Sequence, residues 1–277
     1  MSSIITLTTD FGLTGAYVAS MKGVIQSINP EAVVVDICNT ISPQDITQAA
    51  FILGTASQYF PKGTVHLVVV DPGVGSERRA IVLRTESADF VAPDNGVLSY
   101  VIKQSSIGPD DANQQSKMAP GLKAFAITNP RYWRNPVSPT FHGRDIFAPV
   151  SAHLSLGHSP AYFGEEITSL ETLKTLQLPR PHRESSGSII GHILHIDSFG
   201  NLITDVPAQN LPNEDSPLHI QVGSYTIHGL TRTYAEGEGL LALVGSSDRL
   251  EISVKGGNAH NFLNARIGDE VRISLQQ

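Results

Sequence analysis

Two hydrophobic patterns follow one another along the chain, and this succession most constrains its fold. From residue 3 to about 155, apolar strand-like runs alternate with segments whose apolar residues recur at helical spacing. The first run, residues 4–9, predicts a strand, and residues 17–28 predict a helix. Such alternation is typical of an α/β layer, so we expect an N-terminal α/β domain with a largely parallel sheet.

Later segments extend the alternation. The expected strands are residues 32–37, 64–70, 79–85, 90–91 and 124–128, and a further helix is expected at 145–154. Ser42 and Pro43 predict the start of another helix, because serine is a good N-cap and proline suits a first turn. Asp45, three residues after Ser42, completes the spacing of a capping box. The polar residues 104–123 predict a surface loop.

Short strands with turn signals dominate the rest of the chain. They are expected at residues 188–196, 202–204, 219–222, 240–244, 250–254 and 270–274. This pattern predicts a smaller C-terminal β domain with a barrel-like sheet. We therefore divide the chain into an N-terminal domain of residues 1–178, a linker of residues 179–187 and a C-terminal domain of residues 188–277.

Composition and charge exclude several classes of protein. The formal net charge is -7, and no cluster of lysine and arginine is present, which argues against nucleic-acid binding. No apolar run approaches the ~20 residues of a membrane span, and the N-terminus lacks the pattern of a secretory signal. Cys38 is the only cysteine, so an internal disulfide and a thiolate zinc site are excluded. These features predict a cytoplasmic protein.

Two clusters with reactive side chains follow expected strands. Asp10 lies in Thr-Thr-Asp-Phe-Gly after the first strand, where open α/β sheets bind ligands, and its carboxylate could accept hydrogen bonds from a ribose diol. It could equally cap a turn. Asp71 ends the most hydrophobic strand and is followed by two glycines and by Arg78. The glycine spacing fits neither a P-loop nor a dinucleotide fingerprint, so the alternative is a plain turn with solvated arginines.

Two further clusters lie later in the chain. His142 stands in Thr-Phe-His-Gly-Arg-Asp just before an expected helix, although a lone histidine is usually only a satisfied structural residue. The β domain carries polar residues at strand ends, which are ordinary turn chemistry singly and could together form the wall of a polar pocket. They lie at residues 197–201, 245–248, 251 and 258–259.

The order of these motifs is more specific than any one of them. TTDFG, SPQDI, VVVDPGVGSERRAI, VAPDNGVLS, TFHGRDIFAP, IDSFGNLIT and VGSSDRLEI follow one another along the chain. In this order they resemble the S-adenosyl-L-methionine (SAM) hydroxide adenosyltransferase family, from about residue 4 to 275. The resemblance implies hydrolysis of SAM to adenosine and L-methionine. It also implies a homotrimer whose substrate lies between the N-terminal domain of one subunit and the C-terminal domain of the next.

The resemblance also assigns roles to single residues. The family's catalytic set falls on Asp71, Arg78 and His142, and its ribose-binding carboxylate falls on Asp10. The remaining substrate-binding positions fall on Asn201, Ser246, Glu251 and Ala259, with Asp197, Tyr234 and Phe141 as further expected contacts. The chain departs from many relatives at Gly15-Ala16, where they carry an acidic residue, but this position is outside the catalytic set.

Two alternative functions remain open at this point. SAM-dependent halogenases share the TTDFG carboxylate, but they carry an aromatic residue where Asp71 stands and an arginine where this chain has Ser247. Gly143 does resemble their halide site, whereas residues 80–91 leave no room for the insertion of the fluorinating branch. The second alternative is a non-catalytic sensor of SAM or adenosine, which would need no water-activating group. No HExxH or similar spacing occurs among the ten histidines, so we expect neither a metal nor a cofactor.

Overall fold

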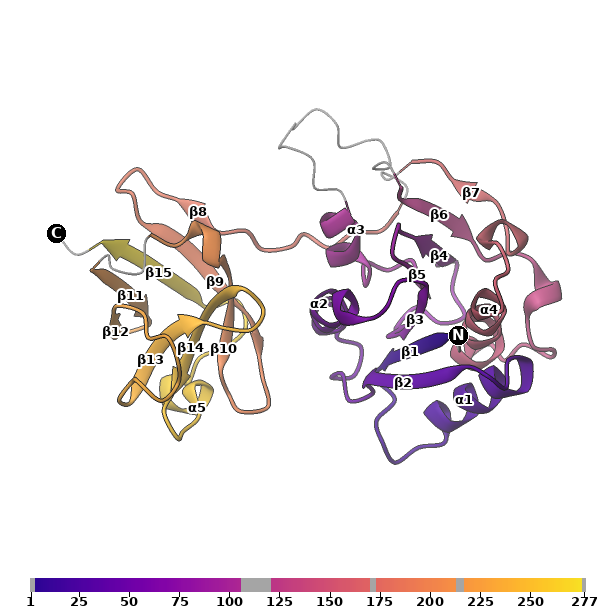
Figure 1. The fold of residues 1–277 in the computed structure, drawn as a ribbon, viewed down its shortest axis with the longest axis horizontal. Coiled ribbons are helices and arrows are strands. Elements are labelled where there is room, and N and C mark those ends of the chain that lie inside the picture. The colour runs from indigo at the N-terminus through magenta and orange to yellow at the C-terminus, as the bar shows by residue number, and fades with distance from the viewer. Residues whose placement is uncertain (1–2, 106–120, 170–172, 213–216, 276–277) are drawn as a thin grey trace. The chain divides into compact units, whose positions relative to one another are not determined.

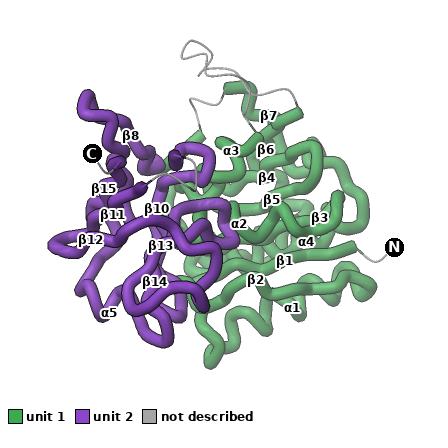
Figure 2. Tube along the Cα trace, turned by 60° about the vertical axis from the view of Figure 1, so that its left-hand side comes forward, with its two compact units in different colours: residues 1–176 green, residues 177–277 purple. Residues whose placement is uncertain are grey.

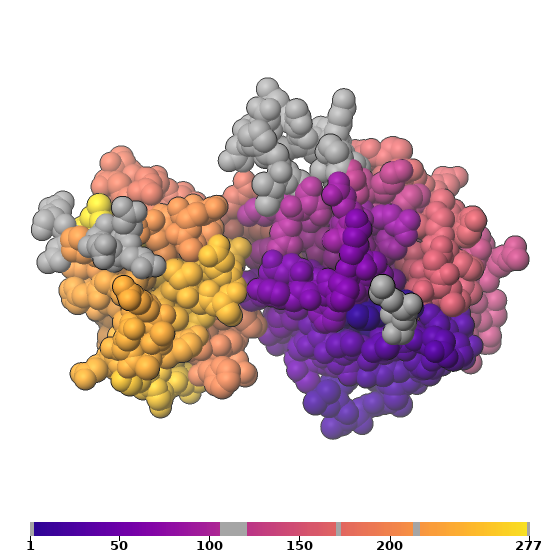
Figure 3. Space-filling view, viewed as in Figure 1, coloured from indigo at the N-terminus to yellow at the C-terminus, as the bar shows by residue number. Residues whose placement is uncertain are grey.

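The computed structural model describes residues 3–105, 121–169, 173–212 and 217–275. Most of the expected polar loop 104–123 lies outside these residues. The chain separates into two compact units, Met1–Leu176 and Gln177–Gln277, coloured separately in Figure 2. In the space-filling view, side chains close the gaps between the ribbons of each unit (Figure 3). The expected linker 179–187 contains a short strand, β8 (His182–Arg183), which pairs with β9 (Ile189–Ile196).

Unit 1 is built on one mixed sheet of seven strands in the order β2-β1-β3-β5-β4-β6-β7. Its strands are β1 (Ile4–Thr9), β2 (Val33–Cys38), β3 (Thr64–Val69), β4 (Ala80–Arg84), β5 (Ala88–Pro93), β6 (Lys123–Ala126) and β7 (Glu166–Ile167). Strands β2, β1, β3 and β5 are parallel, as expected, whereas β4, β6 and β7 add antiparallel pairings. Only three residues join β4 to β5, which allows a hairpin but no parallel crossover.

Helices cover both faces of this sheet, giving three layers (Figure 1). On one face α1 (Tyr17–Ile28) and α4 (Ala148–Ser155) pack against the sheet around buried Met21, Ile25 and Phe147. On the other, α2 (Ile46–Ala56) and α3 (Ser99–Ser105) pack around Leu53 and Val101. The strands supply apolar side chains to both cores, which is why they read as nearly continuous hydrophobic runs. No helix in the described ranges is long and apolar enough to cross a membrane.

The expected start of α2 at Ser42 is wrong. The helix begins at Ile46, and its N-cap is Asp45, which accepts a hydrogen bond from the backbone N–H of Gln48 at 2.8 Å. Gln44 has a left-handed backbone (φ 65°), and its backbone N–H donates to Asp10 Oδ2 at 2.8 Å instead of entering the helix. The hydrogen bond to Asp10 thus holds Gln44 outside the helix, and α2 begins after Asp45 instead of after Ser42.

Unit 2 is a nearly closed antiparallel sheet with its own core. Its strand order is β12-β11-β15-β9-β10-β14-β13, with β8 beside β9, and the two edge strands β12 and β13 approach each other. The remaining bounds are β10 (Leu202–Pro207), β11 (Leu218–Val222), β12 (Tyr225–His228), β13 (Leu240–Val244), β14 (Arg249–Val254), α5 (Ala259–Leu263) and β15 (Glu270–Leu275). The expected barrel-like architecture is confirmed, although β12 and the short helix α5 were not expected.

His66, in the middle of β3, makes the stability of unit 1 depend on pH. Its ring is fully buried, stacks on Phe90 at 4.7 Å and shares a 2.7 Å hydrogen bond with Thr6 Oγ1. Burial lowers the pKa of His66 from 6.5 to about 4, so the unfolded chain binds more protons between these pH values. At about 1.4 kcal/mol per pKa unit, we expect stability to fall by about 3 kcal/mol as pH drops from 6.5 to 4.

Urea unfolding at several pH values tests this expectation. In His66→Gln, which keeps a polar partner for Thr6 but does not titrate, the loss of stability over the same window should be smaller by that amount. Equal pH dependence in both proteins would show that His66 is not the responsible group.

Candidate active site

The carboxyl ends of β1 and β3 bring two acidic side chains to one edge of the sheet. Thr9 of β1 pairs in register with Val69 of β3, so Asp10 and Asp71 both follow at the same edge. Ligands of open α/β sheets bind at this edge. Asp10 is half-buried and accepts the Gln44 N–H through Oδ2, so the structure places it in a turn while its carboxylate stays partly exposed.

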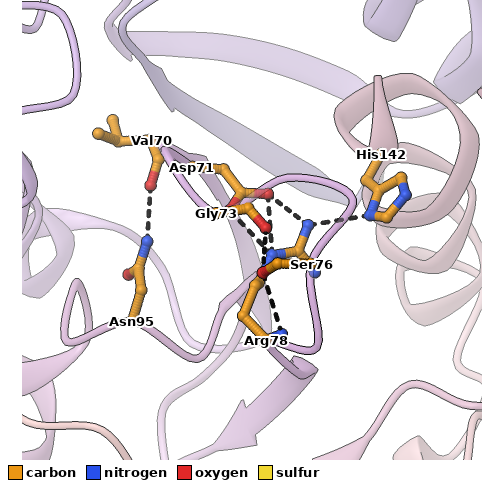
Figure 4. A network of polar contacts seen from close by, with 7 residues as sticks. All are labelled: Val70, Asp71, Gly73, Ser76, Arg78, Asn95 and His142. Atoms are coloured by element: carbon orange, nitrogen blue, oxygen red, sulfur yellow. Dashed lines mark hydrogen bonds and ion pairs between the residues drawn. The ribbon is translucent and has the colours of Figure 1, made fainter. Parts of the chain in front are cut away.

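Asp71, Arg78 and His142 form one continuous chain of hydrogen bonds (Figure 4). Arg78 Nε donates to Asp71 Oδ1 at 2.8 Å and to Oδ2 at 3.0 Å, and Arg78 Nη2 forms a short contact with Oδ2. Arg78 Nη2 also lies 3.0 Å from His142 Nδ1. The side chains of Arg78 and Asp71 are only 11% and 5% exposed, so this ion pair is well shielded from solvent.

The turn between Asp71 and Arg78 is what returns the arginine to the carboxylate. Ser76 closes the turn, since its N–H and its hydroxyl donate to the carbonyl of Gly73 at 3.1 and 2.6 Å. Gly75 has a φ of +77°, and a Cβ there would lie 2.5 Å from the carbonyl oxygen of Pro139. Glycine thus allows this turn to lie against the loop that leads to His142.

Two residues from other segments hold the ends of this arrangement. Asn95 Nδ2 donates to the carbonyl of Val70 at 2.9 Å, directly before Asp71. The guanidinium of Arg78 lies over the ring of Phe147, 5.1 Å from its centroid, and Phe147 is fully buried. Phe147 ends a five-residue π-helix, Gly143–Phe147, that directly follows His142. Irregular helical turns of this kind often occur at functional sites.

The geometry fixes the protonation of His142. An arginine has no acceptor, so Arg78 must donate to Nδ1, and the ring proton of a neutral His142 then lies on Nε2. The pKa of His142 is lowered by burial and then by the charge of Arg78, against the opposing charges of Asp71 and Asp145. His142 is therefore neutral at pH 7, with Nε2–H available as a donor.

Phe141, expected as an aromatic wall, is 9% exposed and belongs mainly to the core. Its ring lies edge-on to Phe11 at 5.7 Å and to Tyr17 at 5.1 Å. Arg144 lies over the same ring, 5.1 Å from its centroid. The aromatic cluster thus supports the segment before His142 and leaves Phe141 little surface for a ligand.

In unit 2, Asp197 and Asn201 share a tight turn. Asp197 Oδ1 accepts the backbone N–H groups of Phe199 and Asn201, both at 2.9 Å, and Oδ2 accepts Asn201 Nδ2 at 2.9 Å. Gly200 has a φ of +83°, and a Cβ there would collide with the side chain of Asn258. The turn therefore packs directly against Asn258, the N-cap of α5, and the carbonyl of Gly200 accepts the backbone N–H of His260 at 2.9 Å.

Glu251 and Tyr234 form the second polar pair of unit 2. Tyr234 Oη donates to Glu251 Oε1 at 2.6 Å, and Glu251 is only 5% exposed. Burial, then the hydrogen bond to Glu251 and its charge, and finally the charge of Asp197 raise the pKa of Tyr234 to about 12. Glu251 of β14 pairs with Ile203 of β10, which places the turn at residues 197–201 near this pair.

The two other expected ligand positions of unit 2 differ from each other. Ser246 is exposed in the turn between β13 and β14, and a Cβ on its neighbour Gly245 would collide with Glu251 Oε2. Ala259 is fully buried with its methyl group in the core, so its side chain offers a ligand no surface. Five of the six expected positions of unit 2 thus present polar side chains near one another, and Ala259 does not.

Sequence reasoning missed the supporting contacts of Asn95 and Phe147. Both residues lie in motifs identified above, VAPDNGVLS and TFHGRDIFAP. Each contacts a residue that is distant in sequence, which the motifs alone do not show. In the described part of the chain, no group of three or more histidine, cysteine, aspartate or glutamate side chains is arranged to hold a metal ion.

Comparisons with known proteins agree with the motif order. The model of the SAM hydroxide adenosyltransferase N-terminal domain matches residues 5–164, and that of the C-terminal domain matches residues 191–272. A Salinispora arenicola protein named (R)-S-adenosyl-L-methionine hydrolase is 35% identical over 273 residues, covering 98% of this chain and 97% of the relative. A Nocardia brasiliensis fluorinase is 27% identical over 232 residues, covering 75% of this chain and 72% of the relative.

A solved structure shows the same fold. The crystal structure of an uncharacterized conserved protein from Thermotoga maritima superposes with a TM-score of 0.84 at 35% identity, covering 98% of this chain and 99% of that one. Since the two domain models together span most of the sequence and the relatives match along its whole length, the chain belongs to the SAM hydroxide adenosyltransferase family.

Proposed function

We propose that this protein is an enzyme that hydrolyses SAM to adenosine and L-methionine. Family membership and relatives named as SAM hydrolases support the reaction. Among the residues, the main support for this reaction is the hydrogen-bonded chain Asp71–Arg78–His142. It lies at the edge of the sheet where open α/β sheets bind ligands. SAM is the substrate, and the proposed reaction uses no cofactor.

The reaction is a displacement at the 5′ carbon of SAM. A water oxygen forms a bond to this carbon while the bond from carbon to the sulfonium sulfur breaks. The electron pair of that bond stays on sulfur, which leaves as the neutral thioether of methionine, and the water proton is released. Positioning of the two reactants contributes roughly 7–11 kcal/mol in well-oriented models, so the protein must chiefly hold water in line with the carbon.

The three residues have complementary roles in this proposal. Asp71 accepts the water proton, because a carboxylate offers about four lone-pair sites and Arg78 does not fill them all. The guanidinium of Arg78 stabilises negative charge as it develops on the water oxygen. His142 donates from Nε2 and orients that oxygen, since Arg78 holds its Nδ1.

One assay tests this function against its alternatives. The pure protein is incubated with SAM, separately as each epimer at sulfur, with and without chloride, and the nucleoside products are separated by chromatography. Adenosine formed without chloride supports hydrolysis, and the relatives' names lead us to expect it from the (R) epimer. A 5′-halogenated nucleoside would identify a halogenase, and unchanged SAM would contradict hydrolysis.

Asp10 is proposed to bind the 2′ and 3′ hydroxyl groups of the ribose. Charge-assisted hydrogen bonds contribute ~1.5–3 kcal/mol, so Asp10→Ala should weaken binding about ten- to a hundredfold in titration calorimetry. Asp36→Ala, which removes an exposed carboxylate from β2, is the matched control and should bind normally. A 2′-deoxy substrate should lose less affinity in Asp10→Ala than in the wild type, and equal losses would exclude this role.

Six residues of unit 2 are proposed to bind the rest of the substrate, and Phe141 of unit 1 is proposed as an aromatic wall. The six are Asp197, Asn201, Tyr234, Ser246, Glu251 and Ala259. Following the family, we propose a homotrimer in which these residues complete the site of a neighbouring subunit. The cytoplasmic location stays a prediction.

The trimer prediction is tested by mass and by complementation. Light scattering should give about three times the chain mass of 29.7 kDa. Asp71→Asn and Glu251→Gln should each be strongly impaired alone, and subunit exchange between them should raise activity because some interfaces then carry neither change. A fully active monomer, or no recovery after proven exchange, would contradict shared sites.

A further inference from the structure

Unit 1 has a cavity away from the candidate active site. It measures about 230 Å³ and lies between α1, α4 and the short 3-10 helix η2 (Pro130–Tyr132). The end of α1 at Ile28 lines it, whereas Tyr17 at the other end contacts Phe141. At ~1.5 Å per residue these two ends of the helix are about 16 Å apart. The cavity is therefore a separate place on the molecule.

Hydrogen-bond donors dominate its polar wall. Arg131 and Arg134 line the cavity on either side of Trp133 in sequence. Arg134 Nη1 lies 3.5 Å from Asp145 Oδ1, a carboxylate that Arg144 already engages at 2.7 and 2.8 Å, so most of the Arg134 donors stay available. Arginine and tryptophan side chains can only donate, and a ligand here must therefore supply acceptors.

Two buried nitrogen atoms on this wall are unsatisfied. Among the described residues, neither Trp133 Nε1 nor His153 Nδ1 has a hydrogen-bond partner, and both atoms are shielded from solvent. Because both atoms are closed to solvent, neither opens onto the cavity, and a ligand there meets the two arginines instead. Burial, then the charge of His158, lowers the pKa of His153, so the net positive charge of the wall comes from the arginines.

The rest of the wall and the volume limit what the ligand can be. Val24, Ile28 and Pro149 form an apolar side. At ~30 Å³ per molecule, the cavity would hold about eight waters, and it is smaller than the ~300–1,000 Å³ of pockets for drug-sized ligands. We propose that this cavity binds a small organic anion, with its acid group on Arg131 and Arg134 and a short apolar body against Val24, Ile28 and Pro149.

The chain offers a direct probe, because Trp133 is its only tryptophan. Hexanoate carries an acid group on a short apolar body, and hexanamide has the same body without charge. Hexanoate should change the fluorescence of Trp133 and give a saturable heat in titration calorimetry, and hexanamide should bind at least about tenfold more weakly. Absence of any heat with hexanoate, or equal affinity for the two compounds, would overturn the proposal.

Three variants locate the binding. Arg131→Gln should weaken hexanoate binding about tenfold. Trp133→Phe, followed by calorimetry, should leave the affinity nearly unchanged, because the buried indole N–H does not reach the cavity. Lys62→Gln removes an exposed charge elsewhere on unit 1 and should bind as the wild type does. Arg131 is exposed, so its replacement should leave the fold intact. Unchanged affinity in Arg131→Gln would place the bound anion elsewhere and refute the site.

Discussion

Replacement of Asp71 by asparagine is expected to lower the turnover of SAM by about 100- to 10,000-fold, the range that positioned acid–base groups contribute. Asparagine keeps the size of the side chain and one acceptor for Arg78, but it cannot take a proton from water. Substrate affinity should stay nearly unchanged, because a group that acts mainly in the transition state lowers turnover more than binding. Turnover by chromatography and Kd by calorimetry give the two quantities separately.

Asp89→Asn is the matched control for this variant. Asp89 also holds an arginine, since Arg84 Nε and Nη2 donate to its two oxygens at 2.7 and 2.6 Å. It pairs with Val65 near the start of β3, at the opposite end of the strands from Asp71. Asp89→Asn should therefore affect stability and leave turnover close to that of the wild type. Normal turnover in Asp71→Asn, or loss of activity through lost binding, would reject Asp71 as the water-activating group.

Much of the fold could be predicted because its signals are local. Residues 4–9 show a clear strand pattern and residues 17–28 a clear helical spacing of apolar residues. As a result, β1 and α1 have the predicted bounds. The antiparallel strands β4, β6 and β7 were not predicted as such. Their direction depends on which strands become neighbours in the sheet, and the spacing of apolar residues along one strand does not show its neighbours. The start of α2 was wrong for a similar reason, because a distant carboxylate, Asp10, holds the preceding turn.

The sequence predicted which residues form the candidate site better than it predicted how they are arranged. Asp71 and Arg78 lie on one short turn, so their pairing follows from local sequence. The arrival of His142 depends on packing between loops more than sixty residues apart, as the contact of the Gly75 turn with Pro139 shows. The order of the motifs along the chain, through the family resemblance, indicated that these residues belong to one site. Hydrophobic periodicity and residue spacing alone could not indicate this. The burial of the Ala259 and Phe141 side chains, in turn, became visible only in the structure.

Arg78 is the centre of the hydrogen-bonded chain, and Arg78→Met should lower turnover about as strongly as Asp71→Asn. Methionine keeps an apolar body over Phe147 but removes both the charge and the donors that reach Asp71 and His142. Residues that act as a unit show strongly non-additive losses, so the double variant should be little slower than either single variant. A double variant slowed by the product of both effects would show that the two residues act independently.

The same variant has a second readout that does not depend on turnover. The positive charge of Arg78 is the second cause, after burial, of the lowered pKa of His142. In Arg78→Met this pKa should rise, and His142 Nδ1, freed from its donor, should be able to carry a proton. Titration of the His142 ring signals by NMR in both proteins measures this change. A pKa that stays where it was would mean that Arg78 does not hold the imidazole in the Nε2–H form, and His142 would then lose its proposed role in orienting water.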